Sequence, residues 1–175
     1  MAPAACEEPE GFRRMAQGPD LALVFDLGGD LYALPAADVF KVVELGTLSI
    51  LPRLPDAIRG ISHHRGRVIT VVDMARLMGG VQVPIDGKNR LVLLEKGGRN
   101  VGLLTGPVEE IVPLDPSTGN PPGREGGLVV RLHLHRGKAL NALSTERLLQ
   151  RIYGLCKPDT VAPVRRALSV APVMS

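Results

Sequence analysis

The sequence predicts a mainly β protein made of two small β-barrels that pack together. Three observations lead to this fold class: strand patterns separated by glycine-rich turns, an internal repeat, and an aliphatic composition. Apolar residues make up 45% of the 175 residues and aromatic residues only 3%, so the core must consist mainly of Leu, Val and Ile.

Proline and glycine divide the chain into one ordered region and two flexible ends. A flexible arm is expected at 1–19, the ordered domain at 20–153, and a flexible tail at 154–175. Within the domain, 115–127 is so rich in Pro and Gly that it is expected to be a loop rather than a strand or helix.

The first strands are expected as a hairpin near the start of the domain. Leu21–Leu27 is an apolar run, and Gly28-Gly29-Asp30 separates it from a second run at 31–34. Glycine supplies the positive φ that tight hairpin turns require. Further on, every residue of 68–72 is β-branched, which predicts another strand. The hairpin pattern recurs around Gly97-Gly98, between strands expected at 91–95 and 99–104.

Two short helices are expected, each beginning after a residue that caps helix N-termini. Asp73 can cap a helix at 74–78, and Ser144 can cap a C-terminal helix at 145–153. Gly154 is expected to end the second helix, because glycine readily adopts the conformation that follows a helix C-terminus.

The chain repeats itself, which is its most informative feature. When Gly28-Gly29 is placed over Gly97-Gly98, 69 residues later, apolar positions coincide. The matched pairs are Leu34 with Leu103, Val39 with Val108, Val42 with Ile111, and Val43 with Val112. At an offset of 71, Arg65-Gly66-Arg67 coincides with Arg136-Gly137-Lys138.

The segments 21–78 and 90–149 are therefore expected to be two copies of one β-rich unit that ends in a short helix. A unit of about 60 residues has a marginal core of its own, so the two copies should bury a joint aliphatic core. Each copy is expected to curl into a small barrel, which removes exposed strand edges. The seam between the barrels is a natural place for a ligand or partner.

The sequence contains no clear catalytic motif. Gly80 and Gly87-Lys88-Asn89 do not meet the spacing or the final residue of a phosphate-binding P-loop. Gly60-Ile-Ser-His-His64 approaches the G-x-S-x-G pattern of hydrolases, but its last residue is His and a strand follows instead of a helix. A serine hydrolase that uses Ser62 with a nearby histidine is the weaker alternative, and the chain is expected not to be an enzyme.

The histidines do not predict a metal site. His63 and His64 are adjacent, while His133 and His135 alternate on one strand and share a face. No third ligand follows either pair at a metal-binding spacing, so no metal and no cofactor are expected. Glu110 is expected to be a solvated carboxylate.

Charge and cysteine content narrow the class of protein further. The net charge is +3, but the basic residues are scattered and few aromatic residues are available for stacking on bases. A small-barrel nucleic-acid-binding protein therefore remains an alternative, although no nucleic-acid partner is expected. Cys6 and Cys156 suggest no disulfide framework. No apolar run is long enough to cross a membrane and the N-terminus does not look like a signal peptide, so a cytoplasmic location is expected.

The segment Ile58-Arg-Gly-Ile-Ser-His-His-Arg-Gly-Arg-Val-Ile-Thr-Val-Val-Asp73 resembles the central signature of CheW-type chemotaxis coupling proteins. The hairpin and third strand at 23–44 and the second-half hairpin at 91–112 also resemble that family, with the elements in the same order. The resemblance extends over about 20–153. It implies two five-stranded, SH3-like β-barrels, in agreement with the repeat.

Four segments depart from the family pattern, and they bear on the choice of receptor rather than on the fold. They are His63-His64, Thr70, Thr105-Gly106-Pro107 and Ala142-Leu143-Ser144.

The resemblance implies a non-catalytic adaptor that links the cytoplasmic tips of chemoreceptors to a CheA-type histidine kinase. The receptor-contacting residues that it implies are Val42 and Glu44 on the third strand, Arg65 and Gly66 in a turn, and Val108 and Ile111 in the groove wall. Glu44 and Arg65 are further expected to be neighbours, with the carboxylate holding the guanidinium in one pose.

Overall fold

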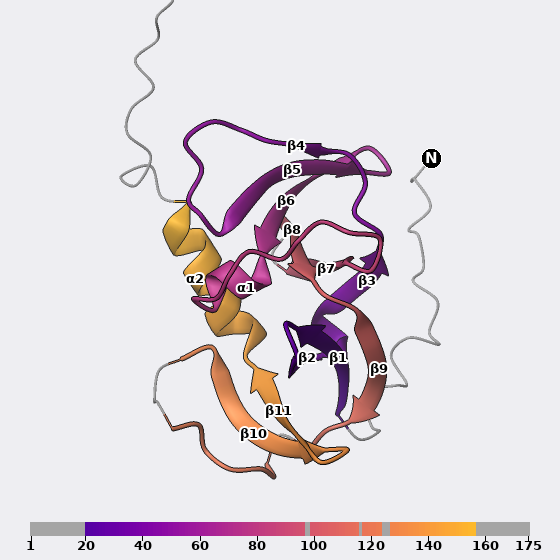
Figure 1. Ribbon diagram of the computed structural model, residues 1–175, viewed down its shortest axis with the longest axis vertical. Helices are drawn as coiled ribbons and strands as arrows, with labels where there is room; N and C mark the ends of the chain where they lie inside the picture. The colour runs from indigo at the N-terminus through magenta and orange to yellow at the C-terminus, as the bar shows by residue number, and fades with distance from the viewer. Residues whose placement is uncertain (1–19, 97–98, 116, 124–126, 157–175) are drawn as a thin grey trace, which may run out of the picture.

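The structure is a computed structural model that describes residues 20–96, 99–115, 117–123 and 127–156 (Figure 1). The expected flexible arm at 1–19 lies outside the described residues, as does the tail from 157 onward. The expected Gly97-Gly98 turn also lies outside them, although the two strands that flank it are described.

The elements follow one another mostly as strands, with one helix at the end of each repeat. In chain order they are β1 (Leu21–Leu27), β2 (Asp30–Pro35), the 3-10 turn η2 (Ala36–Asp38), β3 (Val39–Val43), β4 (Leu48–Ser49), β5 (Ile58–His64), β6 (Arg67–Asp73), α1 (Met74–Leu77), β7 (Arg90–Lys96), β8 (Arg99–Thr105), β9 (Val108–Pro113), β10 (Val129–His135), β11 (Lys138–Leu143) and α2 (Thr145–Leu155). Neither described helix is long and apolar enough to cross a membrane.

The strands form two mixed sheets, which confirms the mainly β fold. One sheet has five strands in the order β10-β11-β2-β1-β9, and the other has six in the order β3-β7-β8-β6-β5-β4. Each sheet combines the first hairpin of one repeat with the later strands of the other. The expectation that each copy forms its own barrel is therefore wrong: the two copies exchange their hairpins, and every sheet contains both.

The exchange follows the internal repeat residue by residue. In the six-stranded sheet, Thr70 of β6 pairs in parallel with Val101 of β8. In the five-stranded sheet, Asn141 of β11 pairs in parallel with Tyr32 of β2. Thr70 and Asn141 are 71 residues apart, and Tyr32 and Val101 are 69 residues apart, which are the two offsets of the sequence repeat. The molecule therefore has approximate two-fold symmetry.

The third strand of each copy carries a β-bulge. Val39 and Lys41 pair with consecutive residues of β7, which leaves Phe40 as an extra residue in β3. In β9, Glu109 is the extra residue, at the matching position. Side chains normally alternate along a strand, but an extra residue restores the same face after three positions. The bulges thus explain the V-x-x-[VI] spacing shared by both copies.

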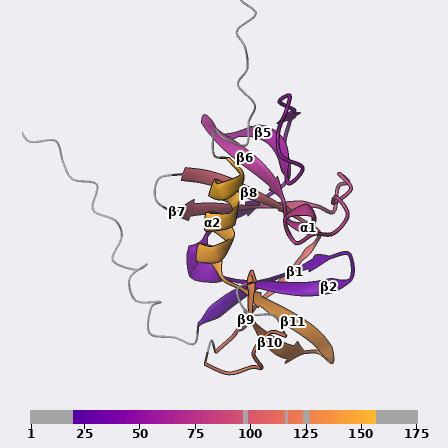
Figure 2. The same ribbon diagram turned by 90° about the vertical axis from the view of Figure 1, so that its left-hand side faces the viewer.

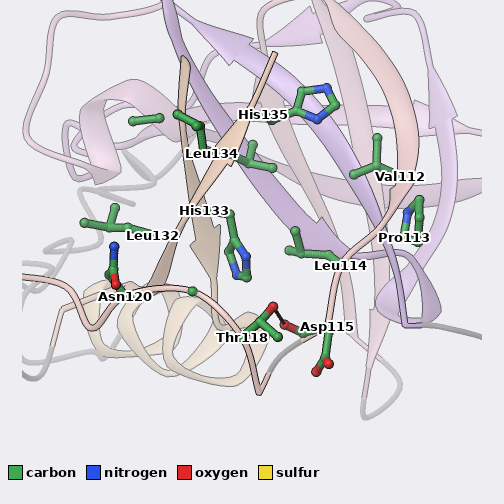
Figure 3. A pocket seen from close by; sticks show the side chains of 13 residues that line it. Val112, Pro113, Leu114, Asp115, Thr118, Asn120, Leu132, His133, Leu134 and His135 are labelled. Atoms are coloured by element: carbon green, nitrogen blue, oxygen red, sulfur yellow. Dashed lines mark hydrogen bonds between the residues drawn. The ribbon is translucent and has the colours of Figure 1, made fainter. Parts of the chain in front are cut away.

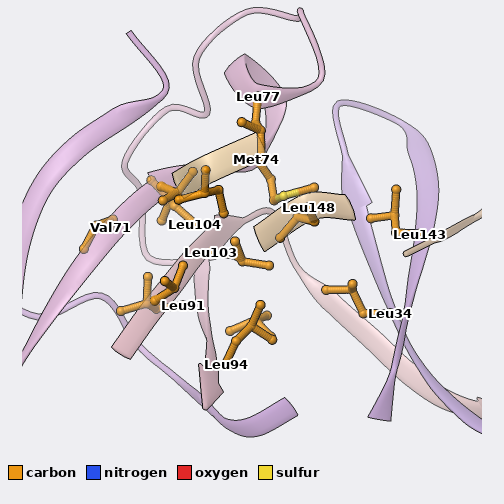
Figure 4. Packing of buried hydrophobic residues seen from close by; sticks show 14 of the residues in the cluster. Leu34, Val71, Met74, Leu77, Leu91, Leu94, Leu103, Leu104, Leu143 and Leu148 are labelled. Atoms are coloured by element: carbon orange, nitrogen blue, oxygen red, sulfur yellow. The ribbon is translucent and has the colours of Figure 1, made fainter. Parts of the chain in front are cut away.

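A single aliphatic cluster joins the two sheets and the two helices (Figure 4). Its members labelled in Figure 4 are Leu34, Val71, Met74, Leu77, Leu91, Leu94, Leu103, Leu104, Leu143 and Leu148. A smaller cluster fills the other face of the five-stranded sheet, around Val24, Val112 and Leu140. The joint core expected from the size of the repeat is confirmed.

Both helix N-termini have the expected caps, but the end of α2 differs from the prediction. Asp73 Oδ1 accepts a hydrogen bond from Arg76 N at 3.0 Å, and Ser144 Oγ accepts one from Arg147 N at 3.3 Å. α2 continues through Gly154 to Leu155, so Gly154 does not end it. The buried face of α2 packs on the joint core, and Figure 2 shows the helix lying across both sheets. Those contacts outweigh the weak helix preference of one glycine.

Candidate functional site

Three of the residues expected to contact a receptor lie on one face of the molecule, which we call the seam face: Val42, Val108 and Ile111. Val42 pairs with the buried Val92, and Ile111 pairs with the buried Leu23, so both point toward the side on which the sheets share their core. Val42 and Val108 are half-buried against that core, whereas Ile111 is 57% exposed. In Figure 1, β3 and β9 both lie on the side of the molecule opposite α2.

Arg65 and Gly66 form the two-residue turn between β5 and β6. Their φ angles are 48° and 77°, as a type I′ hairpin turn requires. A Cβ atom on Gly66 would meet nothing within 4 Å, so glycine is needed there for its backbone conformation and not for close packing. Gly66 is therefore a turn residue, and it places the exposed Arg65 side chain at the tip of the hairpin.

Glu44 follows β3 and is exposed, but it does not hold Arg65. Within the described residues no hydrogen bond or ion pair joins the two side chains, so the predicted contact is not formed. The Arg65 guanidinium is left without a fixed internal acceptor among those residues.

The second repeat does contain such a contact, and the sequence analysis missed it. Glu110 Oε1 lies 2.9 Å from His135 Nε2, and Glu110 Oε2 accepts a hydrogen bond from Arg136 Nη2 at 3.0 Å. We call these three residues the carboxylate clamp. It connects β9 to the tip of the β10–β11 hairpin, and β9 and β10 are the two edge strands of the five-stranded sheet. The expectation of a solvated Glu110 is wrong. The available sequence signal was a charge difference, because the repeat places Glu110 at the position that Lys41 occupies in the first copy.

Asp73, the last residue of the signature segment, has a structural role. It is fully buried, and its Oδ2 accepts hydrogen bonds from Val83 N at 3.0 Å and from Arg59 Nη1 at 3.2 Å. Since Oδ1 caps α1, this one carboxylate holds the helix, β5 and the following loop together. The contacts of Asp73 thus explain this residue by folding rather than by a partner.

Ser62 is not arranged as a nucleophile. Its side chain is buried, and its hydroxyl donates a hydrogen bond to the Thr47 carbonyl at 3.0 Å. A serine nucleophile needs a base within hydrogen-bond reach of its hydroxyl, and here that bond goes to backbone. Ser62 therefore attaches the chain before β4 to β5, and the geometry gives no support to the hydrolase alternative. In the described ranges no group of three potential metal ligands was found.

A hollow of about 540 Å³ lies between β9, β10 and the loop that joins them (Figure 3). His133 points into it, and its Nε2 atom is buried without a hydrogen-bond partner. Gly119 passes so close to this ring that a Cβ atom there would lie 2.8 Å from Cε1. At the rim, hydrogen bonds from the Ser117 hydroxyl and N–H lower the pKa of the Asp115 carboxyl.

Comparison with known proteins supports the picture obtained from the geometry. Residues 21–153 match the family model of the CheW-like domain. The chain is 31% identical over 131 residues to Protein FrzA of Myxococcus xanthus, covering 70% of this chain and 81% of FrzA. It is 27% identical over 95 residues to the chemotaxis protein CheW of Klebsiella aerogenes, covering 53% of this chain and 55% of that protein.

Among solved structures, the scaffolding protein TtCheW from Thermoanaerobacter tengcongensis is similar, with a TM-score of 0.65 and 27% sequence identity. The similarity covers 73% of this chain and 90% of that one.

Proposed function

We propose that this chain, which belongs to the CheW-like domain family, is a non-catalytic adaptor that couples the cytoplasmic tips of chemoreceptors to a CheA-type histidine kinase. The match over residues 21–153 covers nearly the whole described domain and is the observation that carries the proposal. The similar structure is itself that of a scaffolding protein. An adaptor of this kind would act in the cytoplasm, at receptor arrays that its partners anchor.

The seam face is the proposed receptor surface. It presents aliphatic side chains, and Arg65 is exposed at the tip of the β5–β6 hairpin, so the domain offers apolar contact area together with a positive charge that is available to a partner. A helical receptor tip presents apolar side chains flanked by charged ones, which is the complementary pattern. Val42, Val108 and Ile111 would supply most of the affinity, while Glu44 and Arg65 would set the orientation of the helix.

An adaptor also needs a second surface for the kinase, and two anchored loops offer one. Ile50 and Leu51 are exposed in the loop between β4 and β5, and Val81 and Ile85 are exposed in the loop between α1 and β7. Arg76 connects the loops, because its Nη2 donates to Asp56 at 2.9 Å and its Nη1 donates to the Gly80 carbonyl at 3.3 Å. Loops held in place lose little conformational entropy on binding, which favours a protein interface.

Binding measurements with two purified partners would test the proposal. The probes are a receptor cytoplasmic-tip fragment and the regulatory domain of a CheA-type kinase from the same organism. Ile111→Glu is expected to weaken receptor binding about tenfold or more, and Arg65→Glu should do the same. Val81→Glu should weaken kinase binding only.

Leu134→Glu is the matched control, because Leu134 is 80% exposed on β10, outside the seam face. It makes the same change in charge and size on an exposed aliphatic residue, and both partners should bind it normally. If Ile111→Glu and Leu134→Glu bind the receptor fragment equally well, the seam face is not the receptor surface. If the unaltered protein binds neither partner, the proposed function is wrong.

A further inference from the structure

The carboxylate clamp of the second repeat has an incomplete equivalent in the first. The turns at His64–Arg67 and His135–Lys138 have the same backbone, with φ angles of 48° and 77° in one and 50° and 77° in the other. Each turn places a histidine and an arginine side by side at the tip of a hairpin. The acid that these two groups bind in the second repeat has no equivalent in the first.

Strand register identifies which residue stands in place of the acid. Glu110 of β9 pairs with Val24 of β1, and Lys41 of β3 pairs with Leu93 of β7. The two pairs are equivalent under the repeat, since 24 and 93 differ by 69, as do 41 and 110. Lys41 therefore occupies the position of Glu110 and carries the opposite charge.

Among the described residues, no carboxylate binds the equivalent histidine and arginine of the first repeat. His64 Nε2 is buried without a hydrogen-bond partner, whereas the equivalent His135 Nε2 lies 2.9 Å from a carboxylate oxygen. Arg65 is exposed and makes no hydrogen bond or ion pair with any described residue. A buried polar atom without a partner costs about 1–3 kcal/mol, so a ligand that satisfies it gains affinity.

We propose that His64 and Arg65 form a binding site for a carboxylate that the partner supplies, and that this carboxylate is an Asp or Glu side chain of the receptor tip. The inference rests on the proposed function for the identity of the partner, but the site itself follows from the clamp. Arg65 meets the incoming acid first because it is exposed at the hairpin tip. The half-buried His64 ring would complete the contact by turning outward, and Lys41, at the repeat position of Glu110, would add a second positive charge.

His64 is the new element of this site. His63-His64 departs from the family pattern that the chain otherwise resembles, and the proposed site gives that departure a chemical role. A histidine and an arginine together discriminate strongly for a carboxylate, because both donate hydrogen bonds to its two oxygens.

Lys41→Glu is the decisive variant, because it supplies the missing acid from within the chain. The new carboxylate should bind His64 and Arg65 as Glu110 binds His135 and Arg136. Affinity for the receptor-tip fragment should then fall about tenfold or more, while thermal stability is retained. Lys88→Glu, an equal charge change on an exposed loop residue, is the control and should bind normally.

Titration with sodium acetate, followed by NMR of the His64 ring in the full-length protein, tests the site without any receptor. The unaltered protein should show a saturable shift of the His64 signals, and Lys41→Glu should lose that shift. His64→Leu has no imidazole signal, so its readout is the Arg65 side-chain NH signal, whose response to acetate should also be lost. A site that responds to acetate when the receptor fragment does not bind would support the inference and reject only the proposed partner. The proposed carboxylate site would be overturned if Lys41→Glu bound the receptor fragment as tightly as the unaltered protein. It would also be overturned if Lys41→Glu and the unaltered protein responded equally to acetate.

Discussion

Replacing Asp73 with Asn tests how the signature segment stabilises the fold. The Asp73 carboxylate is fully buried and accepts hydrogen bonds from Arg76 N, Val83 N and Arg59 Nη1. Asn can still cap α1 through its one carbonyl oxygen. Its NH2 group, however, would face two donors, Val83 N–H and the Arg59 guanidinium, and could accept from neither.

The expected loss follows from those two contacts. One leaves a buried backbone N–H unsatisfied, and the other removes a charge-assisted hydrogen bond from a mostly buried arginine. Together they should lower the free energy of unfolding by about 3–5 kcal/mol. In a protein of this size, that corresponds to a fall in Tm of about 10 °C. Urea denaturation followed by circular dichroism would measure the first quantity, and differential scanning calorimetry the second.

Asp56→Asn is the control for this measurement. Asp56 also pairs with an arginine, at 2.9 Å from Arg76 Nη2, but its side chain is 83% exposed. An exposed pair of this kind contributes about 0–1 kcal/mol because water screens the charges. The two substitutions make the same chemical change in opposite environments. Equal losses of stability for Asp73→Asn and Asp56→Asn would refute the argument from burial.

Two further variants test the packing and the carboxylate clamp. Gly102→Ala should destabilise the protein by about 1–3 kcal/mol, because its Cβ would lie 2.9 Å from Ile69 Cγ2 in the core. Gly123→Ala is the control and should leave the stability unchanged, because a Cβ there would meet nothing within 4 Å. Urea titration of both variants checks this prediction, and equal unfolding midpoints would contradict it. Glu110→Gln should accelerate amide hydrogen exchange in β9 and the β10–β11 hairpin, because it weakens the contacts of Glu110 with His135 and Arg136. Unchanged exchange in these strands would show that the carboxylate clamp does not hold them together.

The two halves of this protein show how a duplicated unit can divide its roles. Both copies retain the same turn, the same bulged strand and the same parallel pairing. Glu110 and Lys41 differ in charge at matching positions: the acid binds the hairpin tip of the second copy, whereas in the first copy His64 Nε2 stays buried without a partner and Arg65 stays exposed. A charge difference at one position of a symmetric scaffold is thus enough to make one hairpin tip structural and the other available for binding.

Features that depend on a few neighbouring residues were predictable from the sequence. The Asp73 and Ser144 caps, the first hairpin and the turn at Gly66 all follow from local conformational preferences. The length of α2 was not predictable from the sequence, because contacts of its apolar face with the joint core extend the helix past Gly154. The role of Glu110 was missed for a related reason: its partners lie 25 and 26 residues away along the chain.

The sequence by itself determined that two similar β units exist, where their turns and helix caps lie, and that each unit would have only a marginal core of its own. Only the tertiary structure decided that the units exchange hairpins, because the repeat makes a hairpin equally compatible with the strands of either copy. The choice between those pairings depends on the joint core and on the connections between strands, which no local pattern contains. For the same reason, the unsatisfied His64 became visible only when both hairpin tips could be compared in space.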